Sequence, residues 1–396
     1  MSTTSPPSPV EAPARRWPAG RIAAAGVAAV ALALTVVLHA THPNALVTLL
    51  PAPDMRDLHV DFDTFWHSAV ALVHGTDIYD TGAKLRNLNP PVLSLLLAPL
   101  AGFASLTAYR IFAVLTLLLV LGAVLAVCRE LRLGRGWTAA AALAMLASSP
   151  LHGTLLLGQI YGLLLVVLVG GWVADRHGHP VLGGILYGVA VALKPSLAPV
   201  LLLPLVQRRW PAFWGGVGGA AGATVVGALA AGPSSAVDWV RMALSEPVPD
   251  VLDNAAFPGL AMRLHVPSAI GTVLGLVVLV ATLTWIVRRR ADPTGTAPWA
   301  VIAAGLLMSP ISWHNYLLLL WPGILVVVAL TAAGSTARAR VGALLALPLI
   351  PVSWGDLWQD TNPWSPLARS LYCAILLAYW LTLLHHARAS ASHTAS

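Results

Sequence analysis

The sequence has very little charge for its length. Only 10% of its 396 residues are Asp, Glu, Lys or Arg, while 57% are hydrophobic and the mean hydropathy is +0.77. Soluble globular proteins carry about 25% charged residues, so a surface this poor in charge does not keep a 41.4 kDa chain in water. The composition excludes a cytosolic enzyme, a nucleic-acid-binding domain and a secreted disulfide scaffold. It predicts a polytopic protein of the plasma membrane.

Cysteine and the common catalytic motifs are also scarce. The two cysteines, Cys128 and Cys373, both lie in apolar runs, so no disulfide framework is predicted. The sequence contains no HExxH, CxxC, Walker or dinucleotide-binding glycine motif. We therefore expect no cofactor and no metal centre. The pair Asp61 and Asp63 is formally an Asp-x-Asp motif, which leaves a divalent metal open.

The N-terminal part predicts a disordered segment followed by an anchor. Residues 1–20 are rich in Ser and Pro and are expected to form a disordered cytoplasmic N-terminus. The apolar run 22–40 follows Arg15, Arg16 and Arg21, is long enough to span, and is not followed by a clear cleavage site, so we expect it to be retained. Residues 21–387 are expected to form one transmembrane domain, with a cytoplasmic tail at 388–396.

Arginines interrupt the apolar runs at intervals that leave room for two crossings, which predicts the topology. Placing every arginine break in the cytoplasm gives twelve spans with both termini inside. The net charge of +7 then reflects topology and not nucleic-acid binding. The predicted spans are 22–40, 108–128, 137–150, 154–174, 180–193, 196–206, 211–231, 268–287, 297–309, 312–330, 341–353 and 367–385.

Three longer loops fall on the outer side, at about 42–91, 232–267 and 354–366. In the first loop, apolar residues at helical spacing over 62–73 predict an amphipathic helix that lies on the membrane, with Asp61 near its N-cap. Residues 92–104 are apolar but short, and a crossing here would move every later arginine outside. We expect a re-entrant or half-membrane helix that starts at Pro90 and Pro91 and lines a cavity.

Polar and ionisable residues gather at the outer turns, where nearby lipid makes them energetically costly. They are Asp61, Gln159, Lys194, Arg263 and His314. A purely structural role is open for each of them. Asp61 can cap its helix, Gln159 can bridge two helices, and Lys194 can reach the lipid headgroups. Arg263 can be a solvated loop residue and His314 an interfacial residue. Such separate roles do not explain why all five fall on one face, which favours a functional site.

Four segments carry a resemblance to a known family. They are Asp61-Phe62-x-x-Phe65-Trp66-x-x-Ala69-x-Ala71-Leu72-x-x-Gly75 with Ile78-Tyr79-Asp80; Asn89-Pro90-Pro91 with Ala98-Pro99-Leu100; Gly158-Gln159 with Leu193-Lys194-Pro195 and Arg208-Arg209-Trp210; and Ser309-Pro310-Ile311-Ser312-Trp313 with Tyr316. In this order and spacing they resemble glycosyltransferase family 87, which comprises integral-membrane transferases of the GT-C fold that use polyprenyl-phosphate sugars. The segments run from about residue 57 to 330.

Two positions depart from the family pattern. Asn89 stands where the family usually has an aromatic residue before the two prolines. Asn315 stands where a histidine is common, while His314 lies one place earlier. The family includes actinobacterial mannosyltransferases and arabinofuranosyltransferases, and residues 193–205 are similar to the arabinofuranosyl branch, which does not decide the sugar.

The resemblance implies an all-α GT-C enzyme with its active site on the outer face. It is expected to move a hexosyl or pentosyl unit, mannose first and arabinofuranose as the alternative, from a polyprenyl-phosphate donor to a glycolipid or polysaccharide acceptor. Asp61 is the expected general base, with Asp63 as the alternative. Lys194, Arg263 and His314 are expected to hold the donor phosphate. The expected substrate contacts are Trp66, Asn89, Gln159, Asn254 and Trp313.

A secondary transporter or lipid flippase is the alternative from another class. A transporter needs ionisable residues near the middle of the bilayer that are reachable from both faces. Here they gather at outer turns, and no internal repeat is evident. The expected partners are therefore a polyprenyl-phosphate sugar, a glycan acceptor and membrane lipid, without nucleic acid.

Overall fold

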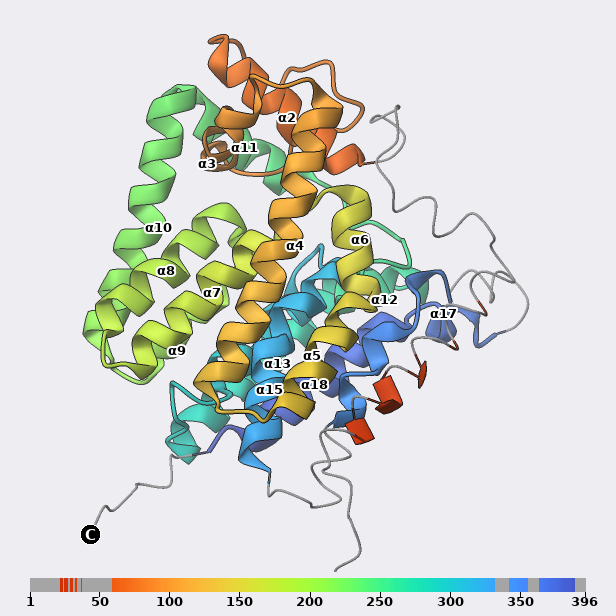
Figure 1. Ribbon diagram of the computed structural model, residues 1–396. Helices are drawn as coiled ribbons and strands as arrows, with labels where there is room; N and C mark the ends of the chain where they lie inside the picture. Colours follow the sequence, from red (N-terminus) through yellow and green to blue (C-terminus); the bar gives the residue numbers. More distant parts are fainter. Residues whose placement is uncertain are drawn as a thin grey trace, which may run out of the picture.

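The structure, a computed structural model, describes residues 59–331, 342–354 and 363–388 together with nine positions between 22 and 37. Within these ranges every named element is helical (Figure 1). In chain order they are α2 (Val60–Val73), α3 (Pro91–Leu97), η2 (Ala98–Leu100), α4 (Ser105–Glu130), α5 (Arg135–Leu146), α6 (Ser149–Leu157), α7 (Tyr161–Arg176), α8 (Pro180–Leu193), η3 (Pro195–Leu201), α9 (Leu202–Val206), α10 (Trp210–Ala231), α11 (Pro233–Ser245), α12 (Phe257–Arg263), α13 (Ser268–Arg289), α14 (Ala297–Met308), η4 (His314–Leu320), α15 (Trp321–Leu330), η5 (Leu347–Leu349), α17 (Ser365–Ala368) and α18 (Leu371–His386).

Three helices, α4, α10 and α13, are long and apolar enough to cross a membrane. A fourth candidate is the pair α5 and α6, which is bent by 46° at its break. At most 33% of the most apolar window of α4, α10 or α13 is buried inside the protein, so these helices turn apolar side chains outward. Such a surface suits lipid and not water. The chain is therefore an all-helical membrane protein, as its composition predicts.

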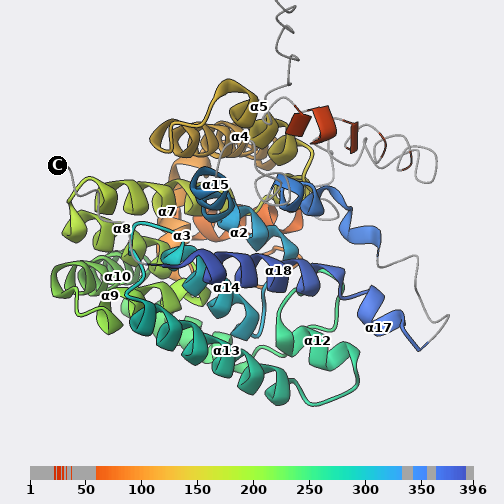
Figure 2. The same ribbon diagram turned by 90° about the horizontal axis from the view of Figure 1, so that it is seen from below.

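The centre of the bundle is α14, which is buried on all its sides except at Met308. A helix that is apolar all round belongs inside a larger assembly of helices. Figure 2 shows α13, α14 and α18 side by side. Trp172, Trp299 and Trp321 are fully buried near this core.

Small residues let α8 and α10 approach closely. A Cβ atom added at Gly184 would overlap the carbonyl oxygen of Ala212, and one added at Gly188 would overlap that of Gly216. Helices in membranes associate through such small-residue contacts because apolar burial alone gives no preference for protein over lipid. The glycines of these two segments therefore determine how α8 and α10 pack.

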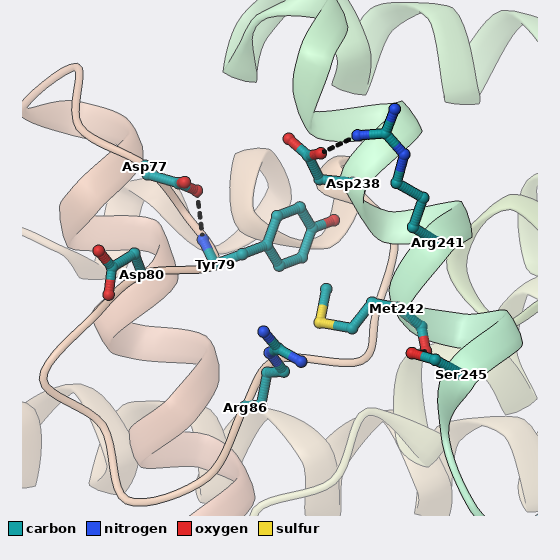
Figure 3. A pocket seen from close by; sticks show the side chains of 8 residues that line it. All are labelled: Asp77, Tyr79, Asp80, Arg86, Asp238, Arg241, Met242 and Ser245. Atoms are coloured by element: carbon teal, nitrogen blue, oxygen red, sulfur yellow. Dashed lines mark hydrogen bonds and ion pairs between the residues drawn. The ribbon is translucent and has the colours of Figure 1, made fainter.

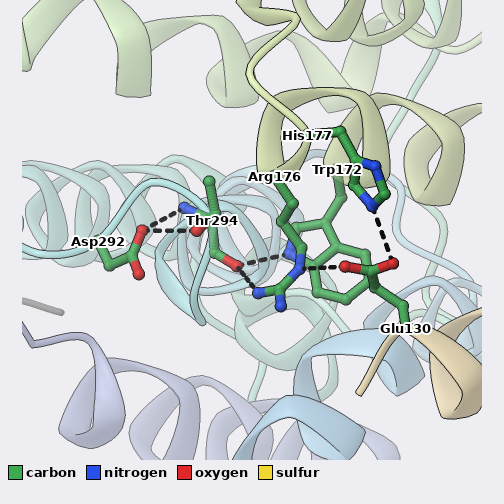
Figure 4. A network of polar contacts seen from close by, with 6 residues as sticks. All are labelled: Glu130, Trp172, Arg176, His177, Asp292 and Thr294. Atoms are coloured by element: carbon green, nitrogen blue, oxygen red, sulfur yellow. Dashed lines mark hydrogen bonds and ion pairs between the residues drawn. The ribbon is translucent and has the colours of Figure 1, made fainter. Parts of the chain in front are cut away.

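Charged side chains join several helix ends at one end of the bundle (Figure 4). Arg176 donates through Nε to Glu130 at 2.9 Å and through Nη1 to the carbonyl of Thr294 at 3.3 Å. Arg209 pairs with Asp175 next to it. These contacts join segments at or next to four of the arginine breaks, those at 129–135, 176, 208–209 and 288–290. The four breaks thus lie at one end of the bundle, as the predicted topology requires.

The segment after Pro90 forms the short helix that the sequence predicts. Pro91 occupies the first turn of α3, and α3 with η2 runs for only ten residues before the chain turns back into α4 at Ser105. Ten helical residues rise about 15 Å, which is half of a bilayer core. Figure 1 shows α2, α3 and α11 gathered at the same end of the molecule.

Three sequence predictions need correction. The helix over 60–73 exists, but its apolar face, including Phe62 and Phe65, packs on protein and does not lie on the membrane. The break predicted between the spans 137–150 and 154–174 is wrong, because α6 (Ser149–Leu157) runs through it as one helix. The crossing predicted at 341–353 is wrong as a continuous helix: residues 342–354 form short turns, since Pro348 and Pro351 interrupt helical hydrogen bonding.

Several predictions lie outside the described residues. They concern the N-terminus at 1–20, nearly all of the span 22–40, residues 42–58 of the first outer loop, residues 355–362 of the last outer loop and the tail from 389 onward.

Candidate active site

The start of α2 is fixed against the end of α6. The backbone N–H of His59 donates to the carbonyl of Leu156 at 3.0 Å, and the His59 ring stacks on Tyr109 with 3.7 Å between centroids. Gly158 ends α6 with φ +73°, and a Cβ atom there would overlap the side chain of Phe62. Glycine is therefore required at 158 both for the left-handed backbone and for the close approach of α2.

This contact places Gln159 against Asp61. The Gln159 Nε2 group donates to Asp61 Oδ2 at 2.7 Å. Asp63 lies two residues further along α2, which is roughly 200° around the helix, and it is 2% exposed with its carboxylate 3.4 Å from His67 Nδ1. The two carboxylates of the Asp-x-Asp motif thus face different surroundings, and Asp61 is the one that belongs to the cluster around Gln159.

The environment of Asp61 favours its protonated form more than water does. Burial raises the pKa of Asp61 to about 6, while the bond from Gln159 and the positive charge of Lys194 partly oppose this rise. The side chain is half-buried and keeps some access to solvent. A carboxylate with a pKa near neutrality is suited to accept a proton during a reaction.

Lys194 lies at a helix break on the same end of the bundle. It follows α8 with an extended backbone, and Pro195 begins the next helix. Its Nζ donates to Asn89 Oδ1 at 3.1 Å. Asn89 is oriented in turn by Asn87, whose Oδ1 accepts from the backbone N–H of Asn89 at 2.9 Å. The amide at position 89 thus holds the ammonium group.

Tyr316, which belongs to the last motif segment, brings two further side chains to the site, Ser196 and Tyr161, neither of which the sequence predicts as a site residue. The hydroxyls of Ser196 and Tyr316 are 2.8 Å apart, and the rings of Tyr161 and Tyr316 meet edge to face with 4.7 Å between centroids. Each neighbours a motif already noted, because Tyr161 follows Gln159 by two residues and Ser196 follows Lys194 by two. Their position next to these motifs is the sequence feature that points to them.

The other predicted residues form a second cluster around the Ser309–Trp313 turn. Asn254 makes an isolated antiparallel bridge with Trp313, and its amide donates to the carbonyl of Pro310 at 3.0 Å. Arg263 is 3% exposed and donates to the backbone carbonyl of Asn254 at 2.9 Å and to Ser370 Oγ at 2.7 Å. These contacts hold the loop together, so they do not favour the phosphate role expected of Arg263, which stays a prediction.

His314 and Trp66 are both engaged by protein groups. His314 is 1% exposed, with Nε2 3.3 Å from the carbonyl of Ser149 and Nδ1 3.7 Å from the carboxylate of Asp253. The Trp66 indole donates to the carbonyl of Leu100 at 3.3 Å and so ties α2 to η2. Their expected contacts with donor phosphate and substrate remain predictions.

A metal centre is not evident in the part of the chain that the structure describes, where no group of three or more His, Cys, Asp or Glu side chains is arranged to hold an ion. The expectation of a metal-independent reaction stays a prediction. The polar chemistry available around Asp61 consists of one carboxylate, one ammonium group, amides and hydroxyls.

The fold and the site define an all-helical membrane protein with a carboxylate and a cation juxtaposed at one end of an apolar bundle. Comparison with known proteins identifies the family. The profile of glycosyltransferase family 87 matches residues 87–310, more than half of the sequence. The chain belongs to glycosyltransferase family 87, which confirms the family that the sequence resembles.

Two relatives illustrate the range of the family. The chain is 27% identical over 270 residues to an alpha-(1->3)-arabinofuranosyltransferase of Corynebacterium glutamicum, covering 63% of this chain and 61% of that protein. It is 27% identical over 335 residues to a polyprenol-phosphate-mannose-dependent alpha-(1-2)-phosphatidylinositol mannoside mannosyltransferase of Mycolicibacterium smegmatis, covering 74% of this chain and 75% of that protein. The match thus spans less than two thirds of the first relative's length.

Among solved structures, the chain is similar to ArnT from Cupriavidus metallidurans bound to undecaprenyl phosphate. The TM-score is 0.35 and the sequence identity 17%, over 91% of this chain and 76% of that one.

Proposed function

We propose that this protein transfers a glycosyl unit, mannose first, from a polyprenyl-phosphate donor to a lipid-linked or cell-envelope glycan acceptor. The observation that carries the proposal is the setting of Asp61. Its carboxylate has a pKa raised to about 6, accepts a hydrogen bond from Gln159 and lies within the electrostatic reach of Lys194. A base and a cation next to an apolar bundle are the groups that this reaction requires.

In the proposed reaction Asp61 takes the proton from the acceptor hydroxyl. The acceptor oxygen forms a bond to the anomeric carbon of the sugar as the bond from that carbon to the phosphate oxygen breaks. The electron pair of the broken bond leaves with the polyprenyl phosphate, so one displacement inverts the anomeric configuration. Asp63 is the alternative base, although its burial beside His67 makes it a poorer partner for a hydroxyl.

Lys194 is the proposed partner of the donor phosphate. Charge grows on that phosphate as the bond to the sugar breaks, and a fixed cation next to it lowers the barrier. The bond from Lys194 to Asn89 orients the ammonium group before the donor arrives. Gln159 is proposed to orient the base, and the Ser309–Trp313 turn with Arg263 and His314 to complete one wall of the site.

The proposed topology follows from the two ends of the bundle. The arginine end is proposed to face the cytoplasm with both termini, and the Asp61 end to face outward. We retain a GT-C fold of about twelve spans as part of the proposal, with one membrane domain over 21–387. The separation of arginines at one end from Asp61 and Lys194 at the other supports a transferase over a transporter, which needs ionisable groups near midplane.

The sugar is to be decided by experiment, and the arabinofuranosyltransferase of Corynebacterium glutamicum among the relatives keeps arabinose as the second candidate. Membranes that contain this protein should be incubated in parallel with radiolabelled decaprenyl-phospho-mannose and decaprenyl-phospho-arabinose. We expect label in a glycan or glycolipid product from one donor, absent from membranes without the protein. Transfer from neither donor contradicts the proposed function.

A further inference from the structure

A polar cleft lies between the loop that follows α2 and helix α11 (Figure 3). Its volume is about 550 Å³, within the range of about 300–1,000 Å³ found for small-molecule sites. The loop contributes Tyr79, Asp80 and Arg86, and α11 contributes Asp238 and Arg241. Figure 3 shows the Tyr79 ring between the two walls. None of these side chains is used by the proposed transfer step.

The side chains of the cleft suit a neutral, hydroxyl-rich ligand. The lining contains three carboxylates, those of Asp77, Asp80 and Asp238, and two guanidinium groups. Asp238 and Arg241 already pair at 3.3 Å. With more acids than bases, the cleft repels phosphate or carboxylate ligands. Planar carboxylate and guanidinium groups each bind two neighbouring hydroxyls, and an aromatic face packs against the C–H face of a sugar ring.

The cleft is connected to the candidate active site through one residue. Tyr79 donates its hydroxyl to the carbonyl of Asn89 at 3.0 Å, while the side chain of Asn89 accepts the bond from Lys194 at 3.1 Å. Burial, followed by the nearby carboxylates of Asp77 and Asp238, raises the pKa of Tyr79, so this hydroxyl remains a donor. The loop wall of the cleft is therefore tied to the same residue that holds Lys194.

The opposite face of α11 places the cleft at the level of lipid headgroups. Val237, Val240 and Leu244 follow helical spacing on that face and are 51%, 45% and 83% exposed. An exposed apolar stripe on a helix with a polar opposite face is typical of a helix that lies in the membrane interface. A glycan anchored in the membrane presents its sugars at this depth.

We propose that the cleft between the 77–86 loop and α11 is an acceptor subsite, which binds sugar rings of a membrane-anchored glycan next to the residue that receives the transferred unit. This inference rests on the proposed function, since that function is what makes the acceptor a carbohydrate. The cleft binds the acceptor and takes no part in donor recognition.

The test measures binding and transfer separately. Purified protein in nanodiscs is titrated with α-1,6-mannotriose, α-1,5-arabinotriose and inorganic phosphate, with binding followed by saturation-transfer NMR. The double variant Asp80→Asn/Arg86→Ala should weaken trisaccharide binding by roughly tenfold or more, since each lost charged hydrogen bond matters by about that factor. The matched control, Glu246→Gln/Arg110→Ala, removes one exposed acid and one exposed arginine outside the cleft and should bind as the wild type.

Kinetics with a membrane-anchored acceptor should show a similar rise in the acceptor KM of the double variant, with the donor KM unchanged. The Asp61→Asn protein should bind trisaccharide normally, so loss of transfer and loss of glycan binding are distinguishable. The inference is overturned if the wild type binds neither trisaccharide, if the double variant binds as tightly as the control, or if phosphate competes for the cleft.

Discussion

The protonation of Asp61 gives a prediction with two independent readouts. Because the base acts only when ionised, and burial raises its pKa to about 6, kcat/KM should fall as the pH drops below 6. Between pH 7 and pH 5 the ionised fraction falls about tenfold, and the rate should follow it. Gln159→Leu removes a bond that favours the ionised form, so it should raise the apparent pKa by about one pH unit.

The same burial should leave a mark on stability. The rise in the pKa of Asp61 from 3.8 to about 6 corresponds to at most about 3 kcal/mol that the folded protein loses when the carboxylate is ionised. Above pH 6 this cost is fully present. As the pH falls from 6 to 4, the folded protein takes up the proton before the unfolded chain does, and the cost disappears. Asp61→Asn should therefore raise the Tm at pH 7.5 and have little effect at pH 4.

The assay compares rate profiles and thermal unfolding of the wild type, Gln159→Leu and Asp61→Asn in the same detergent or nanodisc. A rate that is flat from pH 7 to pH 5, together with a Tm for Asp61→Asn below that of the wild type at pH 7.5, would refute the assignment of a raised pKa to a catalytic base.

Three further predictions test other residues of the candidate site. With a short-chain polyprenyl-phosphate sugar as donor, Lys194→Ala should raise the donor KM and lower kcat by about a hundredfold, while Lys194→Arg should stay partly active. An unchanged donor KM and kcat in Lys194→Ala would mean that the lysine contacts lipid headgroups only. Gly158→Ala should lower both Tm and activity more than Gly75→Ala, since both have positive φ but only the former collides with α2, and equal effects would contradict this contact. Arg263→Gln should lower the Tm by breaking buried bonds. A raised donor KM in this variant would support the phosphate role predicted for Arg263, and an unchanged donor KM would limit this residue to holding the loop together.

The parts of the structure that follow from local rules could be predicted from the sequence. Arginine breaks and helix length located α8 over 180–193 and both ends of α10 and α13 within about two residues. Gly158-Gln159 and Lys194-Pro195 stood out because polar residues and helix breaks are unusual beside lipid. Both lie at the same end of the bundle as Asp61.

The remaining features depend on contacts between segments far apart in the chain. The carbonyls that engage Arg263 belong to loops whose positions no spacing rule provides. The cleft beside Tyr79 forms only where α11 returns to the first loop, with the Trp239 indole donating to the carbonyl of Leu88 at 3.0 Å. The break predicted between the spans 137–150 and 154–174 is displaced, because α6 runs through it and ends only at Gly158, where α2 approaches closely. In each case the missing information was tertiary.

The most direct test of the central claim is transfer by Asp61→Asn from the donor that the wild type uses. A lost general base lowers the rate by about 10²–10⁴, and asparagine keeps the size of the side chain and an oxygen for the bond from Gln159. We predict that Asp61→Asn inserts into membranes and binds donor as the wild type does, but transfers at least a hundredfold more slowly, while Asp63→Asn retains activity. Full transfer by Asp61→Asn, or loss of transfer only in Asp63→Asn, would contradict the account.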